Sequence, residues 1–144
     1  MEMKRVASAG VLIGLFAVTA HAGSLATIGH PARLEVTVPS AARQAGIAML
    51  EVGIASAHRV AGGHPGAVVR LRRGGRVVEL GRISIAAPDA HGTRSYQFNV
   101  TPALRRLDGS GAAEVEVELI DRGGDGPIAS GAALEVGPAR IVTR

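Results

Sequence analysis

The side chains of this sequence best suited to bind a metal ion are its histidines. Four of the five lie beyond residue 22, at His30, His58, His64 and His91. No two of these four are three or four residues apart, so none forms the local ligand pair of a helical zinc motif. His58 and His64 flank a glycine pair, and with His91 they could bind copper or zinc if the fold brings their loops together. The alternative is that they are unrelated histidines in loops.

Catalytic motifs are missing from the sequence. Ser84, Ser95 and Ser110 do not lie in a G-x-S-x-G nucleophile turn. No glycine pattern follows a strand and opens a helix, as a phosphate-binding loop would. Cysteine is absent, which excludes disulfides, thiolate metal sites and a thiol nucleophile. We therefore expect a protein that is not an enzyme and has no cofactor, with copper as the one metal worth testing.

Four arginines gather around the glycine pair Gly74-Gly75, at Arg70, Arg72, Arg73 and Arg76. Such a cluster could bind an acidic partner. A complementary stripe of glutamates alternates with apolar residues further along the chain, at Glu114, Glu116 and Glu118. If the two strands are neighbours, the stripes neutralise each other across the sheet. We favour that second interpretation for the arginines that share the strand face.

The first 22 residues have the three-part pattern of a secretory signal peptide. Lys4 and Arg5 precede an apolar run over residues 6–20, and Ala20-His21-Ala22 offers small side chains at a cleavage site. The apolar run is too short to be a comfortable membrane span. We expect a chain cleaved near Gly23, exported to the periplasm or beyond, with no membrane association after cleavage.

Length and composition limit the remaining chain to one domain, residues 23–144. The whole sequence has 144 residues, of which 47% are apolar and 19% charged. Beyond residue 22, fourteen arginines stand against eleven acidic residues, with one tyrosine and one phenylalanine. Without an aromatic platform or a long basic run, the sequence does not indicate nucleic-acid binding.

Alternating apolar and polar residues predict a chain of short strands. The expected strands are 34–38, 50–54, 67–72, 77–85, 95–100, 113–120, 132–136 and 139–142. Gly74-Gly75 predicts a hairpin turn, because glycine reaches the positive φ that such turns require. The apolar phase changes at Gly81-Arg82, which predicts a β-bulge. Tyr96 and Phe98 share one face, and we expect them in the core.

One segment is typical of a short helix. Thr101 is expected as its N-cap, Pro102 as its first helical residue, and Asp108-Gly109 as its end. Seven or eight short strands with one helical turn predict an all-β fold, an antiparallel β-sandwich.

The second half of the sequence resembles the C-terminal β-sandwich domain of bacterial tyrosinases and plant polyphenol oxidases. The matching segments are Gly81-Arg82-Ile83-Ser84-Ile85, His91-Gly92, Tyr96-Gln97-Phe98-Asn99-Val100-Thr101-Pro102-Ala103-Leu104, the glutamate-bearing strand to Ile120, and the ending from Gly131 to Ile141. The likeness extends over residues 32–143. It implies a β-sandwich fold and assigns His91 and Gly92 to shaping a loop, not to binding metal.

The resemblance also implies a function, because the copper-binding catalytic domain of a tyrosinase has no counterpart in this sequence. In the family, the C-terminal domain covers the copper site, keeps the enzyme latent and is linked to its maturation. A free-standing version would act in trans on a secreted, tyrosinase-like copper oxidase, as a shield or an assembly partner. The alternatives are a free-standing extracytoplasmic structural or interaction sandwich, since a shared fold does not give a function, and a weak copper-binding protein.

Overall fold

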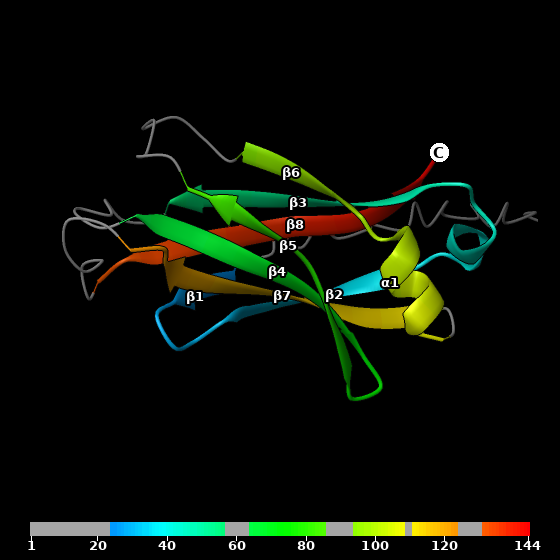
Figure 1. The fold of residues 1–144 in the computed structure, drawn as a ribbon, viewed down its shortest axis with the longest axis horizontal. Coiled ribbons are helices and arrows are strands. Elements are labelled where there is room, and N and C mark those ends of the chain that lie inside the picture. The colour runs from blue at the N-terminus through cyan, green and yellow to red at the C-terminus, as the bar shows by residue number, and fades with distance from the viewer. Residues whose placement is uncertain (1–23, 57–63, 86–93, 109–110, 124–130) are drawn as a thin grey trace, which may run out of the picture.

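Eight antiparallel strands form two four-stranded sheets in the part of the chain that the structure describes (Figure 1). The computed structural model describes residues 24–56, 64–85, 94–108, 111–123 and 131–144. The first sheet has the order β1 (Ser24–Thr27), β8 (Ala133–Thr143), β3 (Ala48–Ser56), β6 (Arg94–Asn99). The second has the order β2 (Ala32–Val38), β7 (Gly111–Asp121), β4 (Pro65–Arg73), β5 (Arg76–Ser84). The all-β antiparallel sandwich expected from the sequence is confirmed.

The core lies between the two sheets and is built from the apolar half of each alternating strand. Leu50 in β3, Leu71 in β4 and Leu134 in β8 are each fully buried. Burying one such side chain stabilises the fold by about 1.5–3 kcal/mol relative to leaving it exposed. Phe98 is buried and Tyr96 packs partly buried against the same core, as expected.

Two strand predictions need correction. The segments 132–136 and 139–142, predicted as separate strands, form the single strand β8. Its register against β3 shifts at Gly137-Pro138, where Val136 lies opposite Ile54 and Ala139 opposite Val52. Between these two pairs β8 has one residue more than β3, and the irregularity accommodates it so that regular pairing resumes on both sides. Strand β1 was not predicted, because four residues are too few to show an alternation.

The bulge expected near Gly81-Arg82 is present in β5, one residue earlier. Val69 of β4 pairs with Gly81 and Arg70 pairs with Glu79, so Leu80 is the extra residue. In a regular strand, residues three apart point to opposite faces. The extra residue brings the side chains of Glu79 and Arg82 to the same face, and Arg82 Nε lies 2.7 Å from Glu79 Oε1.

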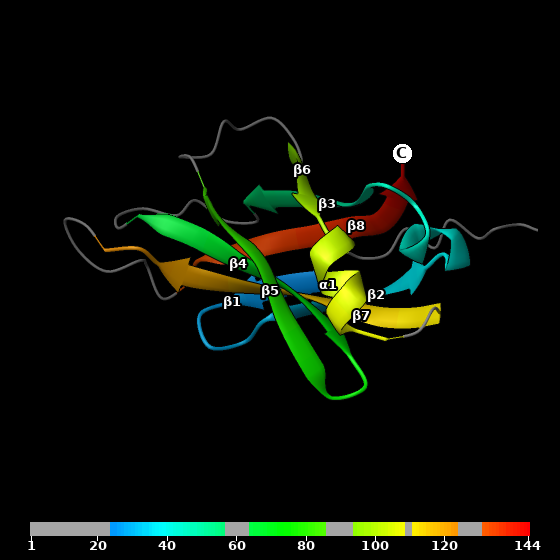
Figure 2. The ribbon, with the colours of Figure 1, turned by 45° about the vertical axis from the view of Figure 1, so that its right-hand side comes forward.

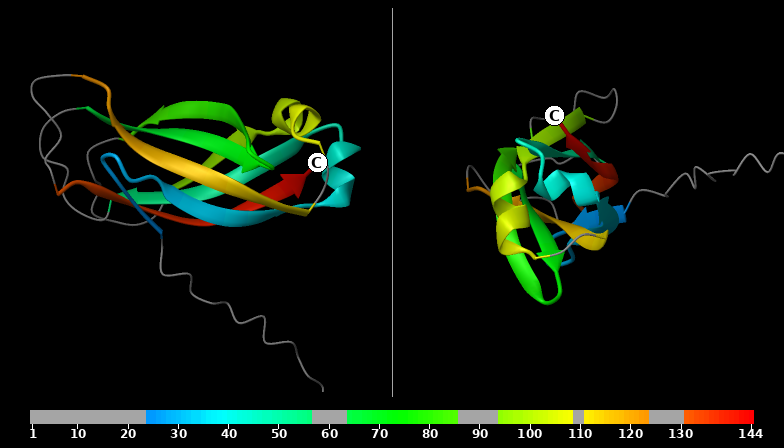
Figure 3. Two further views of the ribbon diagram at one scale, coloured as in Figure 1. Left: turned by 90° about the horizontal axis from the view of Figure 1, so that it is seen from below. Right: turned by 90° about the vertical axis from the view of Figure 1, so that its right-hand side faces the viewer.

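Two short helices lie at one end of the sandwich, near the C-terminus (Figure 3). The predicted helix is α1 (Thr101–Arg106), and η1 (Ser40–Arg43) is a 3₁₀ helix that was not predicted. Thr101 is not the N-cap, which is Val100. The hydroxyl of Thr101 instead accepts a hydrogen bond from the backbone N–H of Ala48 at 2.9 Å. Across the described ranges, no helix has the length and apolar character needed to cross a membrane.

Candidate functional site

The four predicted arginines lie on the β4–β5 hairpin, which projects beside α1 (Figure 2). The turn consists of Gly74 and Gly75, with φ of 54° and 78°. Only glycine adopts this left-handed conformation freely, so the predicted turn is confirmed. Arg73 and Arg76 lie directly opposite each other across the turn.

Arg70 and Arg72 lie on the outer face of the second sheet, beside the glutamates of β7. The antiparallel register places Arg70 opposite Glu116 and Arg72 opposite Glu114. Arg70 Nη1 lies 2.6 Å from Glu118 and 3.2 Å from Glu116, and Arg72 Nη1 lies 2.8 Å from Glu116. The predicted neutralisation of the two stripes across the sheet is confirmed.

Glu116 is the centre of this network. It is the one buried charged residue among those that the structure describes, with 7% of its side chain exposed. Arg33 of β2 adds a third guanidinium, 3.3 Å away. Burial acts to raise the pKa of Glu116, but the hydrogen bonds and charges of Arg72 and Arg70 and the charge of Arg33 together outweigh it. The net pKa is therefore lowered from its ordinary value.

Arg76, directly after the turn, contacts α1. Arg76 Nη1 donates a hydrogen bond to the backbone carbonyl of Arg106 at 2.9 Å, which joins the hairpin to the C-terminal end of α1. Arg73 is partly buried opposite it. Within the predicted cluster, Arg70 and Arg72 therefore bind carboxylates, and Arg76 contacts α1. Binding of a partner by these four residues stays a prediction.

A groove of about 510 Å³ lies between the hairpin and α1, lined by Arg76, Val77, Val78, Arg106 and Leu107. We call it the β5–α1 groove. Val77 is 46% exposed, which is unusual for a valine in a strand of this sandwich. Sequence reasoning missed the contribution of α1, although the adjacent Arg105-Arg106 pair at the end of a predicted helix was a visible cue.

The predicted metal ligands lie mostly outside the described residues. His58, His91 and Gly92 are among the residues that the structure does not describe. His64 immediately precedes the body of β4 and is exposed, and its carbonyl accepts a hydrogen bond from the N–H of Arg122 at 2.8 Å. Within the described ranges, no group of three or more histidine, aspartate or glutamate residues is placed to hold a metal ion. Copper binding stays a hypothesis.

Neither the models of protein families nor the curated proteins contain a match to this chain. The resemblance to the tyrosinase C-terminal domain therefore depends on the short segments quoted above.

Proposed function

We propose that this protein is an exported, non-catalytic accessory module that binds a secreted copper oxidase in trans and either shields it or assists its maturation. The resemblance over residues 32–143 supplies the class of partner. The two-sheet antiparallel fold is the fold that this resemblance implies, and it is consistent with the proposal.

The observation that carries the binding role is an imbalance of charge around α1. Arg76, Arg105 and Arg106 have no carboxylate of the described chain within ion-pair distance. The arginines on the sheet faces differ, since Arg70 pairs with Glu118 and Arg140 with Glu51. Exposed cations beside an exposed apolar side chain are typical of a surface that binds a protein with acidic residues.

The alternative function is an extracytoplasmic structural or interaction sandwich without an oxidase partner. Affinity capture separates the two. The tagged protein is incubated with extracytoplasmic extract of its source organism, and bound proteins are identified by mass. We expect recovery of a copper oxidase that lacks a C-terminal sandwich domain, and no such recovery with an unrelated tagged sandwich.

A second measurement tests the mode of action. The captured oxidase is expressed with and without this protein, and its copper content and phenol oxidation are compared. A maturation role predicts more copper with the protein present, and a shielding role predicts less activity at equal copper content. Failure to recover any specific partner at concentrations well above micromolar would contradict the proposal and leave the alternative.

A further inference from the structure

We propose that the β5–α1 groove is the docking site and that it binds an extended segment of a partner protein in which acidic residues alternate with apolar ones. This inference rests on the proposed function only for the existence of a partner, and it does not depend on that partner being an oxidase.

The floor of the groove is apolar. Val78 is partly buried against the core and Leu107 is 2% exposed at the base. Val77 pairs with Arg72, so its side chain points to the outer face of β5, where nearly half of its surface is open. A segment added along the edge of β5 has side chains on both faces, so an apolar side chain on its outer face could cover Val77 and remove it from water, which favours binding.

The rim of the groove is basic. Arg76 and Arg106 line it, and the exposed Arg105 precedes Arg106 on α1. The nearest carboxylates along the chain are already engaged: Asp108 lies 3.2 Å from Arg43, and Glu79 lies 2.7 Å from Arg82. The groove therefore has an excess of positive charge, and guanidinium groups bind carboxylates through charge-assisted hydrogen bonds.

The backbone of β5 favours an extended occupant. Strand β5 is at the edge of its sheet and pairs only with β4 in the described chain. An edge strand offers free N–H and C=O groups to which an extended segment can add. The bulge at Leu80 interrupts the edge, so the stretch available for such pairing is 76–79.

The sandwich already contains one instance of the same recognition chemistry. In β7, glutamate alternates with valine from Glu114 to Glu118, and this strand pairs with β4, whose Arg70 and Arg72 bind the glutamates. An arginine-bearing strand in this fold thus accommodates an alternating glutamate–valine neighbour. The β5–α1 groove presents arginines and valines to a segment from outside in a similar combination.

The test uses a short dye-labelled peptide of alternating glutamate and valine, with binding to the protein followed by fluorescence anisotropy. Two control peptides replace glutamate by lysine or valine by serine. We expect the glutamate–valine peptide to bind most tightly and its affinity to fall with added salt. Equal binding of the serine peptide would overturn the role of the apolar floor, and absence of binding would overturn the proposal.

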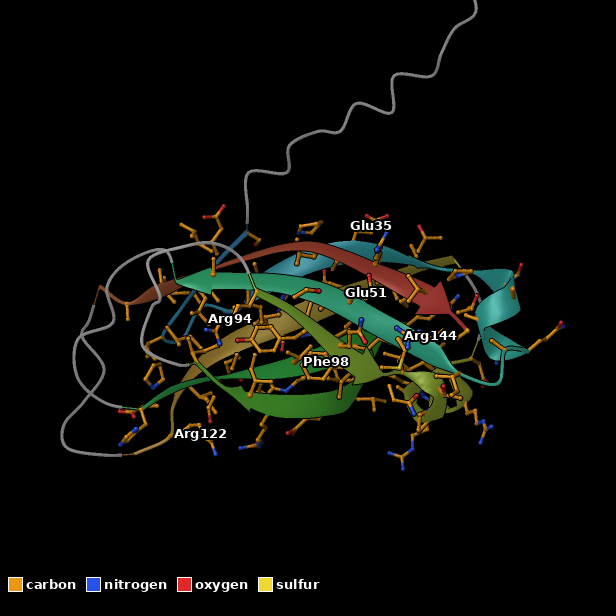
Figure 4. All side chains as sticks on the ribbon, turned by 90° about the horizontal axis from the view of Figure 1, so that it is seen from above. Glu35, Glu51, Arg94, Phe98, Arg122 and Arg144 are labelled. Carbon is orange, nitrogen blue, oxygen red and sulfur yellow. The ribbon has the colours of Figure 1, made fainter. Side chains whose placement is uncertain are left out.

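Matched variants locate the binding surface. Arg106→Glu reverses a charge on the rim but keeps the carbonyl that accepts from Arg76, and Val77→Asp changes an exposed apolar residue on the outer face of β5. Each is expected to weaken peptide binding about tenfold or more. Arg122→Glu reverses a charge at the opposite end of the sandwich (Figure 4) and should leave the affinity within about twofold. An equal loss in Arg122→Glu would show general charge attraction and overturn the site.

Three further outcomes distinguish this inference from the proposed function. If Arg106→Glu still captures the oxidase as the parent does, the groove is not the docking site, but the proposed function stands. If the peptide binds in the groove and no oxidase is recovered, the groove remains a binding site and the proposed oxidase partner is contradicted. If the protein self-associates and Arg106→Glu abolishes this, the occupant is a second copy of the chain and the proposal is wrong. Thermal unfolding of each variant checks that it is folded.

Discussion

The ring of Phe98 in β6 lies against the backbone of Gly81 in β5 so closely that a Cβ atom on Gly81 would be 3.0 Å from its Cε1 and 3.1 Å from its Cδ1. The two residues belong to different sheets, so their contact joins the sheets along one side of the sandwich. Gly81 directly follows the bulge residue Leu80. The bulge and the missing side chain together let β5 approach the ring.

Replacing Gly81 by alanine should therefore destabilise the protein. The added methyl group overpacks against Phe98, and we expect the free energy of unfolding to fall by about 1 kcal/mol. In a Phe98→Leu background the same substitution should cost less, because the smaller side chain leaves room. Denaturant unfolding of the four proteins of this double-mutant cycle measures the coupling. Additive effects would show that the ring does not limit the site.

The buried carboxylate of Glu116 should make stability depend on pH. Its pKa is lower in the folded protein than in the unfolded chain, where a glutamate has a pKa of about 4.3. The ionised carboxylate therefore stabilises the fold above that pH, and this stabilisation is lost as the pH falls through the lower, folded value. Unfolding followed by circular dichroism between neutral and acidic pH measures the loss.

Glu116→Gln should reduce that acid sensitivity and lower stability at neutral pH by about 1–3 kcal/mol, because hydrogen bonds to charged groups are lost. Glu118→Gln is the matched control, since the Glu118 side chain is 35% exposed and, among the described residues, forms its ion pair with Arg70. We expect it to cost less than about 1 kcal/mol. Equal effects of the two substitutions would contradict a special role for the buried carboxylate.

Thr101 should act as a link between α1 and β3, not as a helix cap. Thr101→Val removes the acceptor for the N–H of Ala48, a fully buried residue, and should cost about 1–3 kcal/mol. The specific readout is hydrogen exchange of the Ala48 amide, which should accelerate in Thr101→Val and recover in Thr101→Ser. Unchanged exchange at Ala48 would show that the hydroxyl is not its partner.

The copper hypothesis makes a separate prediction. If His58, His64 and His91 form a site, alanine at all three should weaken Cu²⁺ binding by at least about tenfold, because imidazoles are preferred ligands of this ion. Isothermal titration calorimetry of the parent and the triple variant measures the change. His30→Ala is the matched control. Equal affinity of the parent and the triple variant would remove the hypothesis.

Much of this fold follows from local properties of the chain. The alternation over residues 34–38 and 113–120 marks strands with one face in the core, whatever their neighbours. Gly74-Gly75 predicts its turn because the required φ is a property of the two residues themselves. The change of apolar phase near Gly81 also predicts the bulge, because the positions of the apolar residues show which side chains must face the core.

The choice of strand partners is a property of the tertiary structure. Arg70 and Glu116 are separated by 46 positions, and their pairing exists because β4 and β7 lie side by side in one sheet. The sequence allowed two interpretations of these arginines, binding of an acidic partner and neutralisation by the glutamate stripe. The link from Thr101 to Ala48 and the excess charge around Arg106 likewise depend on which elements the fold brings together. Local sterics and apolar periodicity determine the elements, whereas their neighbours depend on packing both sheets around one core.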